Sequence, residues 1–283
     1  MARGTPLVLG IALLQVASVA HALTLGCDGC GVAGTAGPGT AMLREKSAVL
    51  IYQCREGDAG FANCIPIYEA ALVAAGAIVS WVDAPTGGGA FPANYNPTNY
   101  PVTFVLTGED WWAPSFPPND EQTVAAYLDA GGSLFFSGQD YLYGAGYPDG
   151  PLSGFPLKIG VGQVLQDAPF GTKSMEVVGR GIFDGIVLTL DSSACFSNNP
   201  FYPDDLSPCA GAAGLLVQTD PEQHLGATIY ATDTYRSIFT TIELAGDTSN
   251  QFDTLVGTAW NWLKSGPTPA RSTSWGALKA GFR

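Results

Sequence analysis

The chain has 283 residues, a formal net charge of −13 and only 13% charged residues. Such an acidic balance argues against binding of nucleic acid or of an anionic membrane through the body of the protein. The 36 Gly and 20 Pro, combined with 46% hydrophobic residues, indicate a folded, loop-rich protein and not a disordered one.

The first 22 residues have the organisation of a secretory signal peptide. Arg3 supplies a positive charge, residues 7–20 form a short apolar segment, and Ala20-His21-Ala22 is a small-x-small cleavage site. We therefore expect cleavage after Ala22 and a protein that is secreted or held in the cell envelope. A lipoprotein signal ending at Cys27 is the alternative, but Thr24 stands where such signals have Leu.

Cysteines are the second sign of export. All six follow the signal peptide: Cys27, Cys30, Cys54, Cys64, Cys195 and Cys209. An even number in an exported chain predicts disulfides, and the shortest spacings favour the pairs Cys54–Cys64 and Cys195–Cys209. The CxxC at 27–30 could also be a redox motif or half of a zinc site. It lies in a Gly-rich segment without a second ligand pair, so we expect a disulfide there and neither metal nor cofactor.

The first half of the chain alternates strands with helices. After a Gly-rich leader at 23–43, we expect strands at 47–52, 78–82, 102–106 and 134–136, and helices at 63–75 and 119–130, capped by Asn63 and Asn119. Continuous apolar runs are typical of parallel strands that are buried on both faces. The pattern predicts an α/β fold: a three-layer α/β/α sandwich around a mainly parallel, flavodoxin-like sheet.

The second half predicts a β-rich insertion followed by a return to the main sheet. Expected strands lie at 175–178, 186–190, 215–219, 227–231 and 235–241, with a loop at 192–213 and a last helix at 250–263. The strand at 235–241 should rejoin the central sheet. The α/β domain then spans residues 44–263, and residues 264–283 form a linker and a basic tail.

Three segments carry a resemblance to a known family: Ala48–Tyr52, Val105–Trp112 and Gly131–Asp140. With the closing strand near Tyr235–Phe239 and the helix ending Trp260–Leu263, residues 47–263 resemble a class I glutamine amidotransferase-like domain of the divergent kind found in secreted bacterial proteins. Catalytic members place a Cys at the turn after the strand that ends here near Phe136, with a downstream His and an acidic partner. This turn offers Ser137, Gly138 and Gln139 instead.

The sharpest catalytic hypothesis is a Ser137–His224–acid triad. Ser137 lies at a strand end, and His224, the only His after the signal peptide, follows Asp220 and Glu222 in a polar turn. A serine nucleophile needs a base within hydrogen-bond reach and a third group that orients the base. A surface histidine beside acidic residues is more commonly just solvated.

The best candidate ligand site consists of Glu109-Asp110-Trp111-Trp112 and Gln139-Asp140. Both segments follow apolar strands, and the carboxyl ends of neighbouring parallel strands share one crevice. Glu109 and Asp110 could act as acid and base or hold Ca²⁺, and the tryptophans could stack on sugar rings. The alternative is a loop that packs over the sheet. A phosphate loop is not supported, because Gly-rich residues 31–40 contain no Lys.

The C-terminal tail, Ser272 to Arg283, is similar to a short Trp-Gly, Lys, aromatic-Arg ending of many exported bacterial proteins. Residues 264–283 carry Lys264, Arg271, Lys279 and Arg283 and no acidic residue. The tail could dock on its own domain, stay disordered, or serve as an address for export or anchoring machinery, which we favour because Trp275 and Phe282 are costly to expose without purpose.

From the sequence we expect a secreted, amidotransferase-like domain without the catalytic Cys, acting as a non-catalytic binding or accessory module for a small molecule or glycan. The first alternative is a hydrolase of glycan, ester or peptide bonds that uses Ser137 or the Glu109/Asp110 pair. The second is a structural protein of the envelope.

Overall fold

The computed structural model describes residues 48–54, 64–84, 88–108, 116–166, 174–191, 203–219 and 223–266. Several predictions made from the sequence concern residues outside these ranges. They are the signal peptide, the leader, the C-terminal tail, the segment Glu109–Trp112, and Cys27, Cys30 and Cys195.

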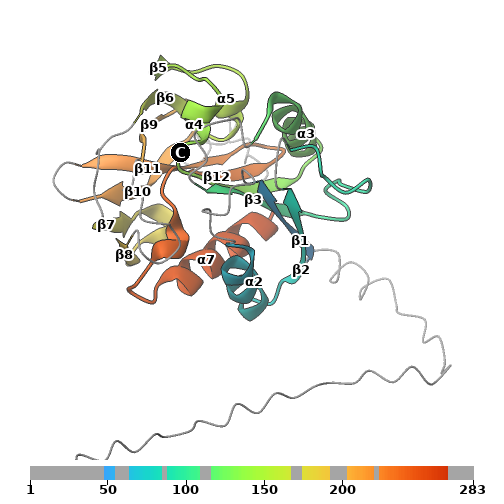
Figure 1. The fold of residues 1–283 in the computed structure, drawn as a ribbon, viewed down its shortest axis with the longest axis horizontal. Coiled ribbons are helices and arrows are strands. Elements are labelled where there is room, and N and C mark those ends of the chain that lie inside the picture. Colours follow the sequence, from blue (N-terminus) through green and yellow to red (C-terminus); the bar gives the residue numbers. More distant parts are fainter. Residues whose placement is uncertain are drawn as a thin grey trace, which may run out of the picture. The chain divides into compact units, whose positions relative to one another are not determined.

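A nine-stranded sheet organises the described residues, in the order β2-β1-β3-β4-β12-β11-β10-β7-β8 (Figure 1). Its first five strands are parallel: β2 (Ile78–Ala84), β1 (Ala48–Cys54), β3 (Val102–Gly108), β4 (Ser133–Gly138) and β12 (Arg236–Thr240). This is the strand order of flavodoxin-like doubly wound sheets, with the reversal of winding between β1 and β3. The mixed α/β class expected from the apolar runs is confirmed.

The remaining strands of the sheet are antiparallel: β11 (His224–Ala231), β10 (Ala213–Gln218), β7 (Ser174–Gly179) and β8 (Val187–Asp191). The sequence correctly placed the closing strand, because β12 pairs in parallel with β4. A small second sheet contains β5 (Gly150–Pro151), β6 (Val161–Leu165) and β9 (Asp205–Pro208). β9 falls inside the segment 192–213 that was expected to be a loop.

Helices cover both faces of the parallel half (Figure 1). α2 (Ile65–Ala74) and α7 (Phe252–Lys264) pack on one face, and α3 (Pro118–Asp129), α4 (Tyr141–Gly144) and α5 (Phe155–Lys158) pack on the other. Two one-turn 3₁₀ helices, η1 (Gly181–Phe183) and η2 (Leu244–Gly246), complete the described elements. α2 turns Ile65, Tyr68, Ala71 and Leu72 inward. This spacing of three and four residues is that of one helix face.

The cap predicted for the second helix is wrong. α3 begins at Pro118 with Pro117 as its N-cap residue, so Asn119 lies in the first turn and not at the cap. The ring of a proline fixes φ near the helical value and the missing N–H is not needed in the first turn, which favours proline at this position. The Asn63 cap predicted for α2 lies outside the described residues; the N-cap position is Cys64.

The expected Cys54–Cys64 disulfide is not formed. Cys54 belongs to the same core layer as Tyr52, whereas Cys64 packs in the layer of Val49 and Ile51, on the other face of the sheet. Successive residues of a strand point to opposite faces, so the two thiols are directed to different sides of β1. Cys209 is described but its expected partner Cys195 is not, so that pairing stays a prediction.

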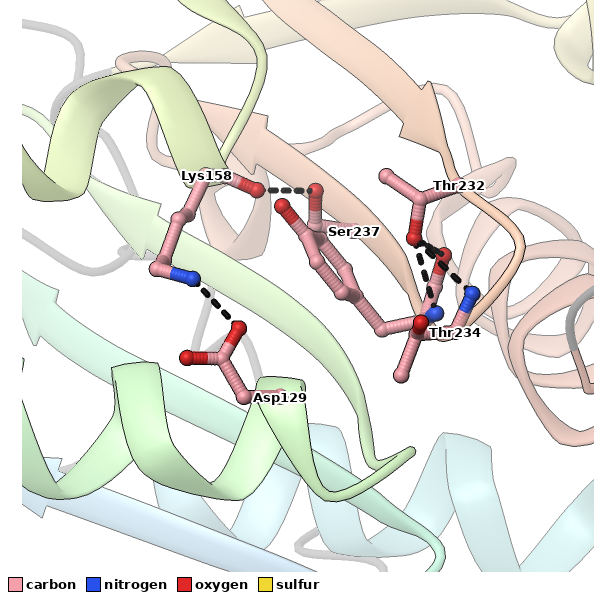
Figure 2. Close-up of polar contacts among 6 residues, drawn as sticks. Asp129, Lys158, Thr232, Thr234 and Ser237 are labelled. Carbon is pink, nitrogen blue, oxygen red and sulfur yellow. Dashed lines mark hydrogen bonds and ion pairs between the residues drawn. The ribbon is translucent and has the colours of Figure 1, made fainter.

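Polar contacts at the amino end of the parallel strands hold the insertion on the sheet (Figure 2). Lys158 of α5 forms an ion pair with Asp129 of α3 at 2.5 Å, and its carbonyl accepts a 3.0 Å hydrogen bond from the Ser237 hydroxyl of β12. The Thr232 hydroxyl accepts from the backbone N–H groups of Thr234 and Tyr235, which closes the turn between β11 and β12. These bonds link α3, α5 and the β11–β12 hairpin at the amino end of the parallel strands, which is opposite the carboxyl end of the sheet.

Candidate functional site

Buried polar side chains gather at the carboxyl end of the parallel strands. In doubly wound sheets this is the end that binds ligands, in the crevice where the winding reverses. Here the reversal lies between β1 and β3, and buried polar residues end or follow these strands and their neighbours: Gln53, Thr107, Ser137, Gln139, Asp140, Thr240, Thr241 and Glu243. The sequence had singled out three of them: Ser137, Gln139 and Asp140.

The turn after β4 is closely packed. A Cβ atom on Gly138 would lie only 2.3 Å from Oγ1 of Thr107, so only glycine lets β3 and β4 approach each other here. Gln139 follows and is 1% exposed, and among the described residues neither its amide nitrogen nor its amide oxygen has a hydrogen-bond partner. The buried hydroxyls of Thr107 and Ser137 likewise have no partner within the described part of the chain. A buried polar atom without a partner costs about 1–3 kcal/mol, so this group calls for a functional explanation.

Glu243 is a buried acidic residue at the carboxyl end of the parallel strands. It follows β12, caps η2 and accepts a 3.0 Å hydrogen bond from the backbone N–H of Ala245. Burial raises the pKa of its carboxyl to about 7, although hydrogen bonds from Ala245, the Tyr68 side chain and Leu244 act in the opposite direction. Tyr68 comes from α2, and its ring packs against Phe104 and Phe135 of the sheet. A buried carboxyl that titrates near neutral pH is typical of functional sites.

The strand register does not bring Ser137 and His224 together. Ser137 lies opposite Thr240, and Thr240 lies opposite Ala227, three residues along β11 from His224. Two strand spacings and three residues of extended chain separate the two Cα atoms by about 14 Å, too far for a hydrogen bond between the side chains. His224 is the first residue of β11, not part of a loop, and its Nδ1 lies 3.5 Å from Asp205 Oδ2.

The backbone after β4 also lacks the geometry of a nucleophile elbow. Such an elbow holds its nucleophile in a strained turn that exposes the side chain. Ser137 is still within the strand and is 1% exposed. Among the described residues only Asn250 has a positive φ without being glycine.

The basic residues that the structure describes gather at one end of the sheet. Every lysine and arginine of the described ranges lies at the amino end of the parallel strands. For example, Arg236 begins β12 and Lys264 ends α7. The full set is Lys158, Arg180, Arg236 and Lys264. The carboxyl end carries acidic residues: Asp83, Asp120, Glu121, Asp140, Asp191, Asp204, Asp205 and Glu243. Among the described residues, this end therefore carries acidic side chains and neither lysine nor arginine.

No group of three or more His, Cys, Asp or Glu side chains is arranged to hold a metal ion within the part of the chain that the structure describes. Glu109, Asp110, Trp111 and Trp112 lie outside that part, so the segment expected to face Gln139 and Asp140 stays a prediction. No described helix is long and apolar enough to cross a membrane.

Comparison with known proteins gives a likeness of fold. No family model matches the chain, and no curated protein is similar to it in sequence. A β-galactosidase from Rahnella sp. R3 superposes with a TM-score of 0.50 at 12% identity, over 76% of this chain and 31% of the galactosidase. The chain thus spans about a third of that enzyme, and the likeness shows a shared fold alone.

Two further structures have TM-scores just below this value. A ThuA-like protein from Parabacteroides merdae has a TM-score of 0.48 at 12% identity, over 77% of this chain and 90% of its own. The carbohydrate deacetylase Agd3 has a TM-score of 0.48 at 14% identity, over 77% of this chain and 32% of its own. At these values neither carries an argument about activity.

Sequence reasoning missed Glu243, Thr107 and Tyr68. A signal for Glu243 was present, because it comes three residues after the last strand residue, Thr240, of an apolar run. A carboxylate that follows a buried parallel strand is placed at the ligand-binding end of the sheet. Tyr68 gave no such signal, since its helical spacing also fits an ordinary core position.

Proposed function

We propose that the chain is a secreted or envelope-bound, amidotransferase-like three-layer α/β domain that binds a small polar ligand without transforming it. The observation that carries this proposal is the amide of Gln139. It is buried at the carboxyl end of β4, and neither its donor nor its acceptor has a partner among the described residues. A ligand that supplies one donor and one acceptor would satisfy both atoms, and an amide is a common hydrogen-bonding group for sugar hydroxyls.

The group at the end of β4 supports a domain that does not catalyse a reaction. In catalytic relatives this turn holds the nucleophile, but Ser137 is buried and its register separates it from His224 by about 14 Å. A serine that no base assists is a poor nucleophile. The chemistry that the family performs elsewhere therefore lacks its reacting group here.

The distribution of basic residues narrows the ligand class. An end with acidic side chains and no described cation disfavours phosphates, uronic acids and nucleic acids, and it tolerates neutral or cationic ligands. A neutral glycan or an amino-sugar glycan fits both the amide of Gln139 and this potential. The tryptophans Trp111 and Trp112, which follow β3 in the sequence, are suitable platforms for a sugar ring.

The test is calorimetric titration of the full chain with neutral oligosaccharides, amino-sugar oligosaccharides and sugar phosphates. We expect binding of one of the first two groups and none of the phosphates. Gln139→Ala should weaken binding by about 10-fold or more. Gln163→Ala, at an exposed position of β6, is the matched control and should bind as wild type does. Preferential binding of phosphates, or binding that ignores Gln139→Ala, would refute the proposal.

Tryptophan fluorescence adds a direct test of the second segment. Ligand binding should quench the emission, and Trp111→Ala should remove most of the quenching. Unchanged quenching in Trp111→Ala and Trp112→Ala would place the ligand elsewhere.

A hydrolase is the second candidate, and the observation in its favour is Glu243. A carboxyl with a pKa of about 7 is suited to transfer protons at neutral pH. In that case the same ligands would be cleaved, and Glu243→Gln would abolish cleavage while leaving binding intact. Glu109 and Asp110 remain candidate partners for such chemistry.

We propose further that the basic tail, Ser272 to Arg283, is an address for export or anchoring. Deleting residues 267–283 should leave the melting temperature unchanged and alter the location of the protein in its host. Loss of folding, or an unchanged location, would show this role to be wrong.

A further inference from the structure

The two outer strands of the large sheet differ in how their free edges are covered. At β8, the segment that follows η2 supplies the missing partners. Thr189 donates its N–H to Asp247 Oδ1 and accepts at its carbonyl from the N–H and hydroxyl of Thr248, and the Val187 carbonyl accepts from the Ser249 hydroxyl. This edge is therefore closed to further strands.

The opposite edge, β2, has no such cover among the described residues. Its seven residues pair with β1 on one side only. Its side chains include Ile78, 49% exposed, and Trp81, 55% exposed, and it contains no Lys, Pro or bulge. Natural proteins protect an edge strand with such devices, because a long apolar edge otherwise recruits another strand.

The adjoining helix carries two exposed apolar residues on different sides. Val73 of α2 is 55% exposed and Ile67 is 37% exposed, and their separation of six residues turns the two side chains about 120° apart. Trp81 lies on the same face of the sheet as α2, since it pairs with Ile51, whose side chain belongs to the core layer beneath that helix. An uncovered edge strand with an exposed aromatic side chain is typical of a protein interface.

We propose that this edge, formed by β2 with Trp81, joins two copies of the chain about a two-fold axis, with β2 paired antiparallel to β2 of the second copy. Pairing centred on Trp81 sets the two Trp81 side chains opposite each other, and it sets Asp83 opposite Val79. No like charges then face each other directly, and the central aromatic pair is a favourable cross-strand contact.

Charge favours a second copy as the occupant. Two chains of net charge −13 repel each other over most of their surface. From Cys64 to Ala84 the only charged residues are Glu69 and Asp83, and Asp83 is engaged by Gln53 Nε2 at 3.5 Å. This low-charge surface is where two acidic copies approach at least cost, and a strand edge is matched best by another strand.

Sedimentation of the full chain over a range of concentrations tests the proposal. We expect a monomer–dimer equilibrium, and Trp81→Lys should raise the dissociation constant of the dimer by about 30-fold or more, because it sets two like charges at the centre. Leu165→Lys, at a residue that is 52% exposed on β6, is the control and should dimerise as wild type does. A wild-type monomer at all concentrations, or a dimer that Trp81→Lys leaves intact, would overturn the proposal.

A cross-linking experiment tests the proposed dimer if Trp81→Lys fails to fold. In the proposed register the two Cα atoms at position 81 lie about 4.5–5.5 Å apart, a separation that a disulfide can bridge. Trp81→Cys should form a covalent dimer under mild oxidation, and Leu165→Cys should give no more than the wild-type background. Equal cross-linking of the two variants would contradict the two-fold arrangement.

Discussion

Ser137 and Thr240 lie directly opposite each other in the parallel pair formed by β4 and β12. This register places Ser137 beside the strand that leads to the buried carboxyl of Glu243. Thr240 does not serve Ser137 as a partner, because its hydroxyl donates to the Ile242 carbonyl at 3.1 Å and accepts from the Ile242 N–H at 3.0 Å. These two hydrogen bonds stabilise the end of β12, and the Ser137 hydroxyl takes no part in them.

Replacing Ser137 should therefore not destabilise the protein. Ser137→Ala removes a buried hydroxyl that has no partner, so we expect the free energy of unfolding to be unchanged or to rise by up to about 1 kcal/mol. Ser237→Ala is the matched control, because that buried hydroxyl donates to the Lys158 carbonyl at 3.0 Å, and it should cost about 1 kcal/mol. Urea unfolding measures both. A larger loss in Ser137→Ala than in Ser237→Ala would show that the Ser137 hydroxyl is bonded.

Stability should fall as the pH rises from about 4.5 to about 7, and Glu243 should account for part of the fall. Burial raises the pKa of Glu243 from 4.5 to about 7. In this window the folded protein keeps a proton that the unfolded chain has lost, so raising the pH favours unfolding, by a contribution on the order of 3 kcal/mol. Melting curves at several pH values give the slope.

Glu243→Gln supplies the control for this slope, because the amide is uncharged at every pH. The variant should lose less stability between pH 5 and pH 8 than wild type does. An identical pH dependence in both proteins would mean that the Glu243 carboxyl does not titrate in this range.

Two neighbouring glycines should respond very differently to alanine. Gly88 and Gly89 have φ values of 67° and 77°, so alanine is strained at either position by about 1 kcal/mol. A Cβ on Gly88 would also lie 2.2 Å from Asp120 Oδ2, whereas a Cβ on Gly89 meets nothing within 4 Å. Gly88→Ala should therefore cost about 1–3 kcal/mol more than Gly89→Ala in chemical unfolding. Equal losses would show that the loop shifts freely away from Asp120.

Asp247 should be a principal cap of α7. Its carboxylate accepts from the backbone N–H groups of Thr189, Ser249, Gln251 and Phe252. Burial raises its pKa, but these bonds and the Ser249 hydroxyl outweigh burial and lower the pKa below 3.8, so its contribution is present above that pH and is lost as the pH falls. Asp247→Ala should cost about 1–2 kcal/mol at pH 7, and less in acid. Asp253→Ala, at an exposed position of the same helix, should change the melting temperature little.

The parallel half of the fold could be predicted because its strands are continuous apolar runs and a helix follows both β1 and β3. β9 could not, because Asp205–Pro208 contains one buried apolar residue, Leu206, and its partner strand β6 lies forty residues earlier in the chain. The predicted Cys54–Cys64 pairing was wrong for a similar reason. Spacing along the chain makes Cys54 and Cys64 neighbours, and only the alternation of β1 shows that they belong to different faces.

The site was predictable in position but not in composition. Gln139 and Asp140 could be placed at the carboxyl end because they directly follow an apolar run. The proximity of Tyr68 to Glu243 depends on how α2 packs against the sheet, and no local pattern encodes that packing. The separation of Ser137 from His224 likewise follows from strand order, which the sequence leaves open.

The central claim is that this domain binds its ligand without a catalytic serine. Once a ligand is known, its turnover by wild type and by Ser137→Ala should be compared under saturating conditions. We expect no turnover above the uncatalysed rate in either protein, and equal affinities within a few-fold. Turnover by wild type that falls by about 1000-fold in Ser137→Ala would make Ser137 a nucleophile and would contradict this account.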